Sequence, residues 1–192
     1  MIERIIAYHC GPALAGIKPA NIVACYKDKI SDVHKTIRLL NLQLNHKDIY
    51  IEALCECEKR VLVIVYRRKK LGDQLNRDEI KNFLYSFGYN PDAELCENIS
   101  KLKERMTNKE NFPHEIGAFL GYPLHDIYGF IYHRDAGCIL TGEWKVYEDE
   151  DGARKLFMRY NKCRRALLAR LEEGKTLAQI FCCLLYTSPS PR

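Results

Sequence analysis

The sequence predicts one α+β domain in which a small antiparallel or mixed sheet packs against several helices. Two observations carry this prediction: a β-hairpin pattern at about residues 49–67, and apolar residues that recur at helical spacing on both sides of it. Of the 192 residues, 47% are hydrophobic and 29% are charged, as expected for a globular protein with one core. Residues 1–182 contain no internal repeat and no linker rich in proline, glycine or serine, so they are expected to form a single domain.

The hairpin pattern has two arms of different character. Residues 49–57 alternate between two kinds of side chain, whereas residues 61–66 are continuously apolar and mostly β-branched. An unbroken apolar strand is typical of a position that is buried on both faces, so the second arm is expected to be central. Only Glu58, Lys59 and Arg60 separate the arms, which predicts an antiparallel hairpin.

The chain before the hairpin is expected to hold one strand and two helices. Residues 5–8 predict a short strand, which the His9-Cys10-Gly11-Pro12 run ends. Residues 17–26 predict a helix that opens at Pro19, because a proline at the first helical position loses no hydrogen bond. Ser31 is expected to cap the next helix, whose apolar face is formed by Val33, Ile37, Leu40 and Leu44.

The chain after the hairpin reads mainly as helices. Asn76 begins a segment with the spacing of a capping box, and Gly88 is expected to end that helix in a left-handed conformation. Asn90 and Pro91 are expected to open another helix, and Thr176 and Gln179 form a further capping box. The remaining expectations are an exposed loop at 108–111, helices at 113–120, 125–131 and 153–171, and a hairpin or late strand at 138–147.

Residues 183–192 are treated separately from the domain. Their sequence is similar, letter for letter, to one reading frame of a common DNA-library adaptor. They are therefore expected to be non-native, with the natural continuation lost after about residue 182, and their Ser-Pro-Ser-Pro run is not read as a linker.

Composition points to a soluble cytoplasmic protein. No apolar run approaches the ~20 residues that a membrane-spanning helix needs, and the N-terminus lacks the pattern of a signal peptide. The nine cysteines are scattered through periodic segments, so reduced and mostly buried thiols are expected rather than a disulfide scaffold. No membrane partner is expected.

Two basic clusters raise the question of nucleic acid. One covers residues 67–70, and the other places Lys162, Arg164, Arg165 and Arg170 on one helix beside acidic residues. The formal net charge is only +5, one unit of which belongs to Arg192. Solvated faces are therefore favoured over a nucleic-acid interface, and a nucleic-acid-binding regulator ranks last among the hypotheses.

Cys10 is a candidate nucleophile because it stands where a strand is expected to turn toward a helix. A thiol becomes reactive where positive charge stabilises its anion, and His114 or His125 could supply the base. A structural cysteine at a tight turn is the favoured alternative, since free cysteine is among the most buried residue types. The sequence leaves open whether the protein is an enzyme.

The glycine-containing run before Asn21 resembles a phosphate loop only superficially. In a phosphate loop the lysine follows the second glycine directly, but here Ile17 separates Gly16 from Lys18, and Pro19 replaces the hydroxyl residue. A weaker interpretation remains, in which Lys18 near a helix N-terminus holds an anionic group. The competing interpretation is a plain connection between a strand and a helix.

No metal site is expected. Cys55 and Cys57 share one face of a strand, but a metal would need further ligands, and no second close pair of cysteine or histidine occurs. Thiols that face a core are the favoured explanation for this pair.

Two sequence blocks resemble a known family. The first is residues 9–21, of the form His-Cys-x-Pro-x-Leu-Ala-Gly-x-Lys, and the second is residues 114–123, of the form His-Glu-Ile-Gly-x-Phe-Leu-Gly-Tyr-Pro. With residues 126–130, 142–147 and 162–163, they resemble a family of bacterial proteins of unknown function that is common in anaerobic Gram-positive bacteria. The resemblance spans about residues 5–180 and implies a cytoplasmic location, but it supplies no activity, cofactor or catalytic residue. The family's block carries a hydroxyl residue where this chain has Ala13.

The leading hypothesis is a domain that binds a small ligand or a protein partner. The expected cleft lies between the turn at residues 9–21 and the helices at residues 114–130, and no cofactor is indicated. Its candidate binding residues are His9, Lys18, Asn21, Glu115, Tyr122 and Asp126. The rival hypothesis is a thiol-dependent enzyme that uses Cys10 with His114 or His125.

Overall fold

The computed structural model describes residues 2–107 and 112–182. Its architecture is α+β, as predicted, with a three-stranded antiparallel sheet, a separate two-stranded sheet and helices around both. The loop expected at 108–111 and the tail at 183–192 lie outside the described residues.

The main sheet has the order β1-β3-β2, with every neighbouring pair antiparallel. Its strands are β1 (Ala20–Tyr26), β2 (Ile49–Glu56) and β3 (Arg60–Arg67). The predicted hairpin is therefore confirmed, and the apolar arm is the central strand. A bulge between Ala53 and Cys55 shifts the register of β2.

Each face of the main sheet is covered by its own core. Val61, Val63 and Val65 pack against α1 (Ile2–Leu14), α2 (Val33–Leu44) and α9 (Leu177–Cys182). Ile64 and Tyr66, on the opposite face, pack against α3 (Arg68–Leu75), α4 (Asp78–Tyr85), α5 (Leu95–Thr107) and α6 (Ile116–Phe119). Because side chains alternate along a strand, β3 must be apolar at both parities.

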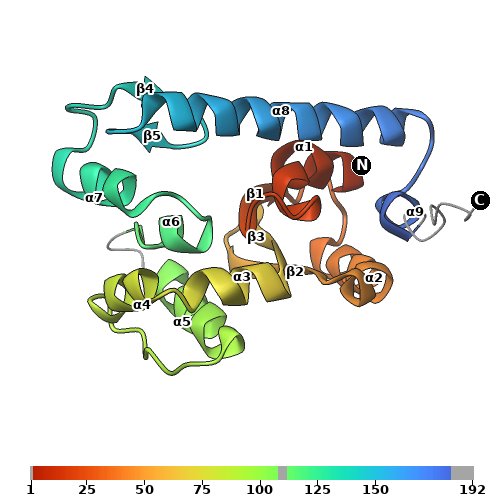
Figure 1. Ribbon diagram of the computed structural model, residues 1–192. Coiled ribbons are helices and arrows are strands. Elements are labelled where there is room, and N and C mark those ends of the chain that lie inside the picture. The colour runs from red at the N-terminus through yellow and green to blue at the C-terminus, as the bar shows by residue number, and fades with distance from the viewer. Residues whose placement is uncertain (1, 108–111, 183–192) are drawn as a thin grey trace, which may run out of the picture.

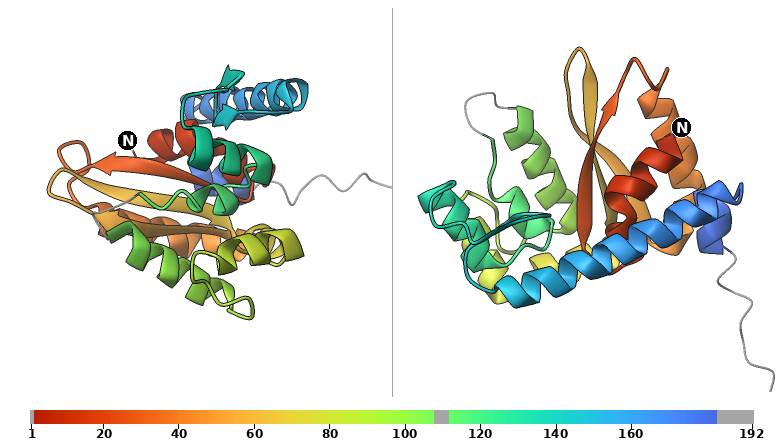
Figure 2. Two further views of the ribbon diagram at one scale, coloured as in Figure 1. Left: turned by 90° about the vertical axis from the view of Figure 1, so that its left-hand side faces the viewer. Right: turned by 90° about the horizontal axis from the view of Figure 1, so that it is seen from above.

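The helix α8 (Glu150–Glu172) is the longest described helix and runs across α1 (Figure 1). One of its ends lies near α9, and the other reaches the small sheet of β4 (Leu140–Thr141) and β5 (Lys145–Val146) (Figure 2). A third cluster of buried residues joins α8 to this sheet: Trp144, Val146, Ala153 and Tyr160. The small sheet follows α7 (Leu124–His133), so the late hairpin and the helix before it occur where they were expected.

Two predictions for the N-terminal segment are wrong. Residues 5–8 belong to helix α1, in which Ile2, Ile6, Cys10 and Leu14 recur every four residues on the buried face. Pro12 lies in the last turn of the helix, where it lacks the N–H that would donate to the Tyr8 carbonyl. Residues 20–26 form strand β1 instead of a helix, because their alternate side chains pair and pack along β3.

Helix boundaries also differ in part. Asp32 rather than Ser31 caps α2, with its carboxylate accepting from the Lys35 N–H at 2.8 Å. The residue before α4 is Arg77, and no side chain caps that helix, so the box expected at Asn76 is not formed. Helix α5 begins at Leu95 instead of near Pro91.

The Thr176 capping box is confirmed. The Gln179 N–H donates to Thr176 Oγ1 at 3.2 Å, and the Thr176 N–H donates to Gln179 Oε1 at 2.8 Å. Gly88 has a φ of 82°, as the left-handed end of its helix requires.

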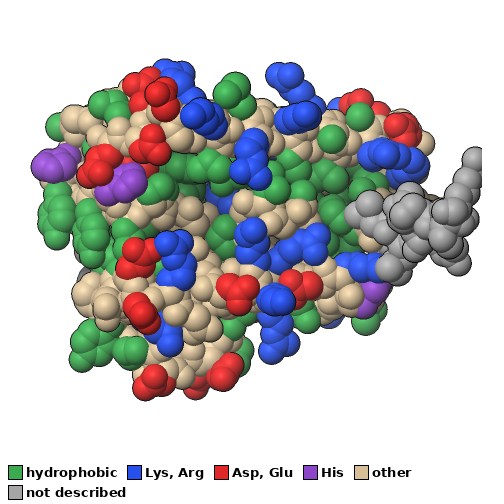
Figure 3. All heavy atoms as spheres, viewed as in Figure 1, with side chains coloured by type: hydrophobic (Ala, Val, Ile, Leu, Met, Phe, Trp, Pro, Cys, Tyr) green, Lys and Arg blue, Asp and Glu red, His purple; other side chains and the backbone are tan. Residues whose placement is uncertain are grey.

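The basic cluster at residues 67–70 is not simply a solvated face. Arg67 closes the C-terminal end of α1, where its Nε donates to the Leu14 carbonyl at 3.0 Å and its Nη1 donates to the Lys47 carbonyl at 2.9 Å. A positive charge at the C-terminal end of a helix also interacts favourably with the helix dipole. On the face seen in Figure 3, Lys and Arg side chains are interspersed with Asp and Glu.

The thiols are less buried than expected. The seven cysteines whose side chains the structure describes are free, but only Cys10 and Cys25 of these are buried, and Cys57 and Cys96 are exposed. Cys55 is half-buried, because the bulge in β2 breaks the alternation that would have turned both thiols of the 55–57 pair toward a core. None of the described helices is both long and apolar enough to cross a membrane.

Candidate functional site

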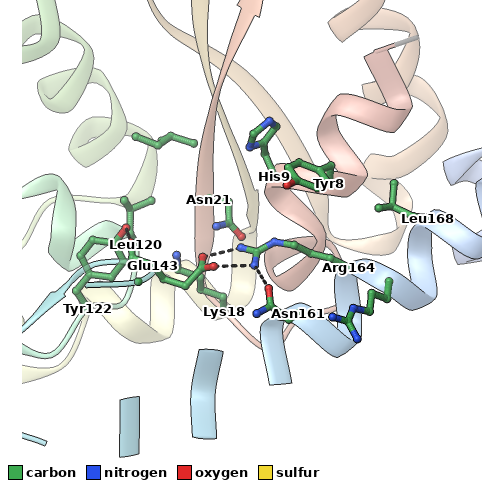
Figure 4. A pocket seen from close by; sticks show the side chains of 13 residues that line it. Tyr8, His9, Lys18, Asn21, Leu120, Tyr122, Glu143, Asn161, Arg164 and Leu168 are labelled. Atoms are coloured by element: carbon green, nitrogen blue, oxygen red, sulfur yellow. Dashed lines mark hydrogen bonds and ion pairs between the residues drawn. The ribbon is translucent and has the colours of Figure 1, made fainter. Parts of the chain in front are cut away.

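A pocket of about 620 Å³ opens where α1, the start of β1, α8 and the connection between β4 and β5 meet. Four of the predicted binding residues line it: His9, Lys18, Asn21 and Tyr122. The other polar residues of its lining are Tyr8, Glu143, Asn161, Arg164 and Arg165 (Figure 4). The pocket borders the 9–21 segment, as the expected cleft does, but α8 and the β4–β5 connection supply much of its wall.

Lys18 is held in the pocket wall by the turn that follows α1. Gly16 makes this turn possible with a φ of 72°, and the Lys18 N–H donates to the Pro12 carbonyl at 3.2 Å. The Lys18 side chain is only 1% exposed, yet it contributes to the pocket lining. Strand β1 follows Lys18, so the helix N-terminus expected beside it does not exist.

The ammonium group of Lys18 lies among aromatic rings. Its Nζ is 4.8 Å from the centroid of the Tyr122 ring and 5.7 Å from that of Tyr160. Cation–π contacts of this kind attract the charge, but they offer no hydrogen-bond acceptor. Among the described residues, no hydrogen bond or ion pair reaches this nitrogen.

Burial lowers the pKa of Lys18 to about 8, because the charged amine loses its hydration. The Glu143 carboxylate opposes this shift and Arg164 adds to it. A substantial fraction of Lys18 is therefore neutral at slightly alkaline pH, unlike an exposed lysine.

Glu143 is engaged by Arg164 rather than by Lys18. The Arg164 guanidinium donates to Glu143 Oε1 at 2.7 Å and to Oε2 at 2.6 Å, a two-pronged ion pair in which both side chains are largely buried. Arg164 also donates to Asn161 Oδ1 at 3.1 Å (Figure 4). The Tyr122 hydroxyl donates to the Glu143 backbone carbonyl at 3.0 Å, so the β4–β5 connection is fixed against both α8 and Tyr122.

Asn21 and His9 supply the other predicted polar groups. The Asn21 side-chain oxygen accepts from the Ala13 N–H at 3.1 Å, which fixes the amide orientation and leaves its NH₂ group for the pocket. His9 lies at the exposed rim. Partial burial, and then Arg164, lower the pKa of His9.

The two predicted carboxylates do not line this pocket. Asp126 is buried and accepts from Trp144 Nε1 and from the Tyr147 N–H, each at 2.7 Å. Glu115 is fully buried and forms an ion pair with Arg105. Both carboxylates therefore join segments of the fold, and Asp126 also borders a separate apolar pocket of about 240 Å³ beside Tyr122.

The structure does not bring Cys10, His114 and His125 together. The Cys10 side chain is fully buried in the core beneath the sheet, and burial raises its pKa. His114 lines the apolar pocket, with its Nε2 2.8 Å from Arg134 Nη1, whereas His125 lines another pocket with Tyr128 and Glu148. A buried thiol of raised pKa is a poor nucleophile, so the geometry argues against the thiol-enzyme hypothesis.

Sequence reasoning missed Glu143 and Arg164 as site residues. Arg164 was assigned to a solvated face, and nothing in its local pattern distinguishes it from Arg165. Its role depends on a partner 21 residues away along the chain. Within residues 2–107 and 112–182, no three metal-ligating side chains form a cluster that could hold an ion.

The fold and the site define an α+β domain with a polar pocket built around a buried lysine. The chain matches, over residues 6–181, the model of a family described as a protein of unknown function (DUF3793), and it belongs to that family. No curated protein and no solved structure matches the chain. The predicted resemblance to a family of unknown function is thereby confirmed.

Proposed function

We propose that this protein binds a small anionic molecule in the pocket around Lys18. The observation that carries the proposal is a lysine 1% exposed whose ammonium group meets no acceptor among the described residues. Burial of a charge costs free energy unless an opposite charge or a hydrogen bond compensates for it. An anionic ligand would supply the partner that the protein itself does not.

The charge of the lining favours the same ligand class. Lys18, Arg164 and Arg165 are cationic, and Glu143 is the single carboxylate that borders the pocket. Arg164 neutralises this carboxylate through its two-pronged ion pair, so the charges of Lys18 and Arg165 remain. The volume of about 620 Å³ falls within the range that small-molecule sites occupy.

The concave shape of the site favours a small ligand over a protein partner or nucleic acid. A buried ammonium inside a pocket is accessible to a small molecule but poorly placed for the flat surface of a protein partner. Nucleic acid would require a continuous basic surface, whereas acidic side chains interrupt the basic ones on the face seen in Figure 3.

Thermal unfolding in the presence of small anions tests the proposal. We expect inorganic phosphate, acetate or a short dicarboxylate to raise the melting temperature of the wild-type chain, because a ligand that binds only the folded state stabilises it. The matched variants are Lys18→Met, which removes the buried charge, and Lys162→Met, which removes an exposed charge on α8. The stabilisation should disappear in the first variant and persist in the second. Equal stabilisation in both would contradict the proposal.

We further propose that the protein works in the cytoplasm of a bacterium. The support is that the seven cysteines whose side chains the structure describes are free, a state that a reducing compartment maintains. Fractionation of cells that express the tagged native gene tests this location, and recovery in a secreted or envelope fraction would contradict it.

A further inference from the structure

We propose that Lys18 is also a nucleophile, which forms an imine with a small carboxylate that carries an aldehyde or keto group. This inference rests on the proposed function, since the same pocket first binds the ligand as an anion. It adds a covalent step at the Lys18 amine to the charge recognition argued above.

The position of the amine supports nucleophilic attack. Lys18 is the one lysine on the pocket lining, and its Nζ lies near the Tyr122 and Tyr160 rings without an acceptor to hold its protons. Glu143 is the carboxylate on the pocket lining that could otherwise pair with the Lys18 ammonium group. Both of its oxygens already accept from Arg164. The nitrogen is therefore not committed to an ion pair that would keep it protonated.

Desolvation makes this amine more reactive than a surface lysine. A lysine must lose a proton before its lone pair can attack a carbonyl carbon, and burial favours the neutral form. The pKa of about 8 for Lys18 means that about half of the amine is neutral at pH 8. An ordinary lysine with a pKa near 10.4 is less than about 1% neutral at that pH.

The rest of the pocket can hold the carboxylate of such a ligand. The Asn21 NH₂ group faces away from its backbone partner Ala13, and the exposed Arg165 forms no ion pair among the described residues. Both donors lie on the same lining as Lys18. A ligand with a carboxylate next to its carbonyl can therefore keep its charge compensated after Lys18 has become an imine nitrogen.

The step balances without an oxidant or a reductant. The lone pair of the neutral Lys18 amine forms a bond to the carbonyl carbon, and the carbonyl π electrons move to oxygen. One amine proton transfers to that oxygen to give a carbinolamine. The hydroxyl group then leaves with the second amine proton as water, and the C=N bond of the imine remains.

Trapping with sodium cyanoborohydride tests the imine on the wild-type chain at pH 8. Pyruvate and glyoxylate serve as probes, and lactate, which has the same charge but no aldehyde or keto group, is the control. Reduction converts the imine to a stable secondary amine, so the modified peptide gains the mass of the probe less one oxygen atom. We expect modification at Lys18 to exceed that at the exposed Lys162 by roughly tenfold or more, because burial favours the neutral, nucleophilic form of the Lys18 amine. Lactate should give no adduct.

Modification of Lys18 no faster than that of Lys162 with either probe would overturn the imine. This comparison uses two lysines of one folded chain, so it does not depend on whether a variant folds. If pyruvate and lactate both stabilise the wild-type chain but not Lys18→Met, and Lys18 is not trapped, the imine fails and the anion site stands. If neither anion binds and Lys18 is not trapped, both proposals fail.

Discussion

The buried charged side chains of this protein fall into two groups, which differ in whether the fold supplies a hydrogen-bond or ion-pair partner. Asp126 is buried with both carboxylate oxygens accepting, from Trp144 and the Tyr147 N–H, and Glu115 pairs with Arg105 through Oε1 while its Oε2 has no partner among the described residues. Lys18 is equally buried, but its ammonium group lies beside aromatic rings and has no hydrogen-bond or ion-pair partner among the described residues. A charge with partners stabilises the fold, whereas a charge that the fold leaves without an acceptor and open to a pocket marks a place for a ligand. The predictions below test this contrast.

The largest loss of stability should follow the loss of Asp126. Asp126→Ala leaves the Trp144 indole N–H and the Tyr147 N–H without their acceptor, and hydrogen bonds to a carboxylate contribute about 1.5–3 kcal/mol each. We expect the free energy of unfolding in urea to fall by roughly 3–5 kcal/mol. Glu148→Ala, at an exposed neighbouring position, should change it by less than about 0.5 kcal/mol. Similar losses for the two variants would remove the structural role assigned to Asp126.

Loss of the Lys18 charge should increase the free energy of unfolding, whereas loss of Asp126 should decrease it. The pKa of Lys18 is about 8 in the folded chain and 10.5 for the free side chain, so the unfolded chain binds more protons between these values. The contribution of Lys18 to the free energy of unfolding should therefore rise with pH from about 8 to about 10.5, and below pH 8 the folded chain carries the full cost of the buried charge. The groups that set this shift besides burial are Glu143, Arg164 and Cys10.

Lys18→Met removes that cost while keeping an unbranched side chain of similar length. At pH 7 we expect this variant to be more stable than the wild type by up to about 3 kcal/mol, with the advantage lost as the pH approaches 10.5. Urea unfolding at a series of pH values measures the difference. A variant that is less stable than the wild type across the whole range would mean that the fold uses the ammonium group after all.

Glu143 should separate ligand binding from stability. Glu143→Gln removes the charge that neutralises Arg164, so the guanidinium becomes free to attract the anion that Lys18 binds. We expect the affinity for a probe such as inorganic phosphate to increase severalfold in isothermal titration calorimetry, while the fold loses about 1 kcal/mol. Weaker anion binding by this variant would indicate that Glu143 itself holds the ligand.

The smallest effect is expected at Cys10. Native alkylation with iodoacetamide should modify the exposed Cys96 and Cys57 long before Cys10, because the Cys10 thiol is fully buried and its pKa is raised. Peptide mapping of the partly modified chain gives the order. Fast modification of Cys10 would revive the thiol-dependent hypothesis.

The sequence predicted most of the elements from which the fold is built. The apolar run of β3, the spacing of α8 and the Thr176 capping box each act locally, so their patterns can be recognised without a partner. The first 26 residues were predicted wrongly for the opposite reason. Strand β1 is specified by its pairing with β3, and α1 contains Pro12, a residue whose local pattern indicates a break.

The candidate site was predicted in part. All four residues that the structure shows to be buried and polar, namely Lys18, Asn21, Glu115 and Asp126, were among the predicted binding residues. The sequence could not separate the two that face the pocket from the two that stabilise the fold, since this depends on partners brought together by tertiary packing. The same is true of the Arg164–Glu143 pair, which joins helix α8 to a connection in the small sheet.

The most direct test of the central claim is a nuclear magnetic resonance titration of Lys18 with ¹³C-labelled lysine. In the free protein the signal of the Lys18 ε-carbon should titrate with a pKa near 8, and addition of inorganic phosphate or pyruvate should raise this value, because a bound anion favours the ammonium form. A Lys18 pKa in the ordinary range near 10.4, unchanged by either anion, would contradict the account.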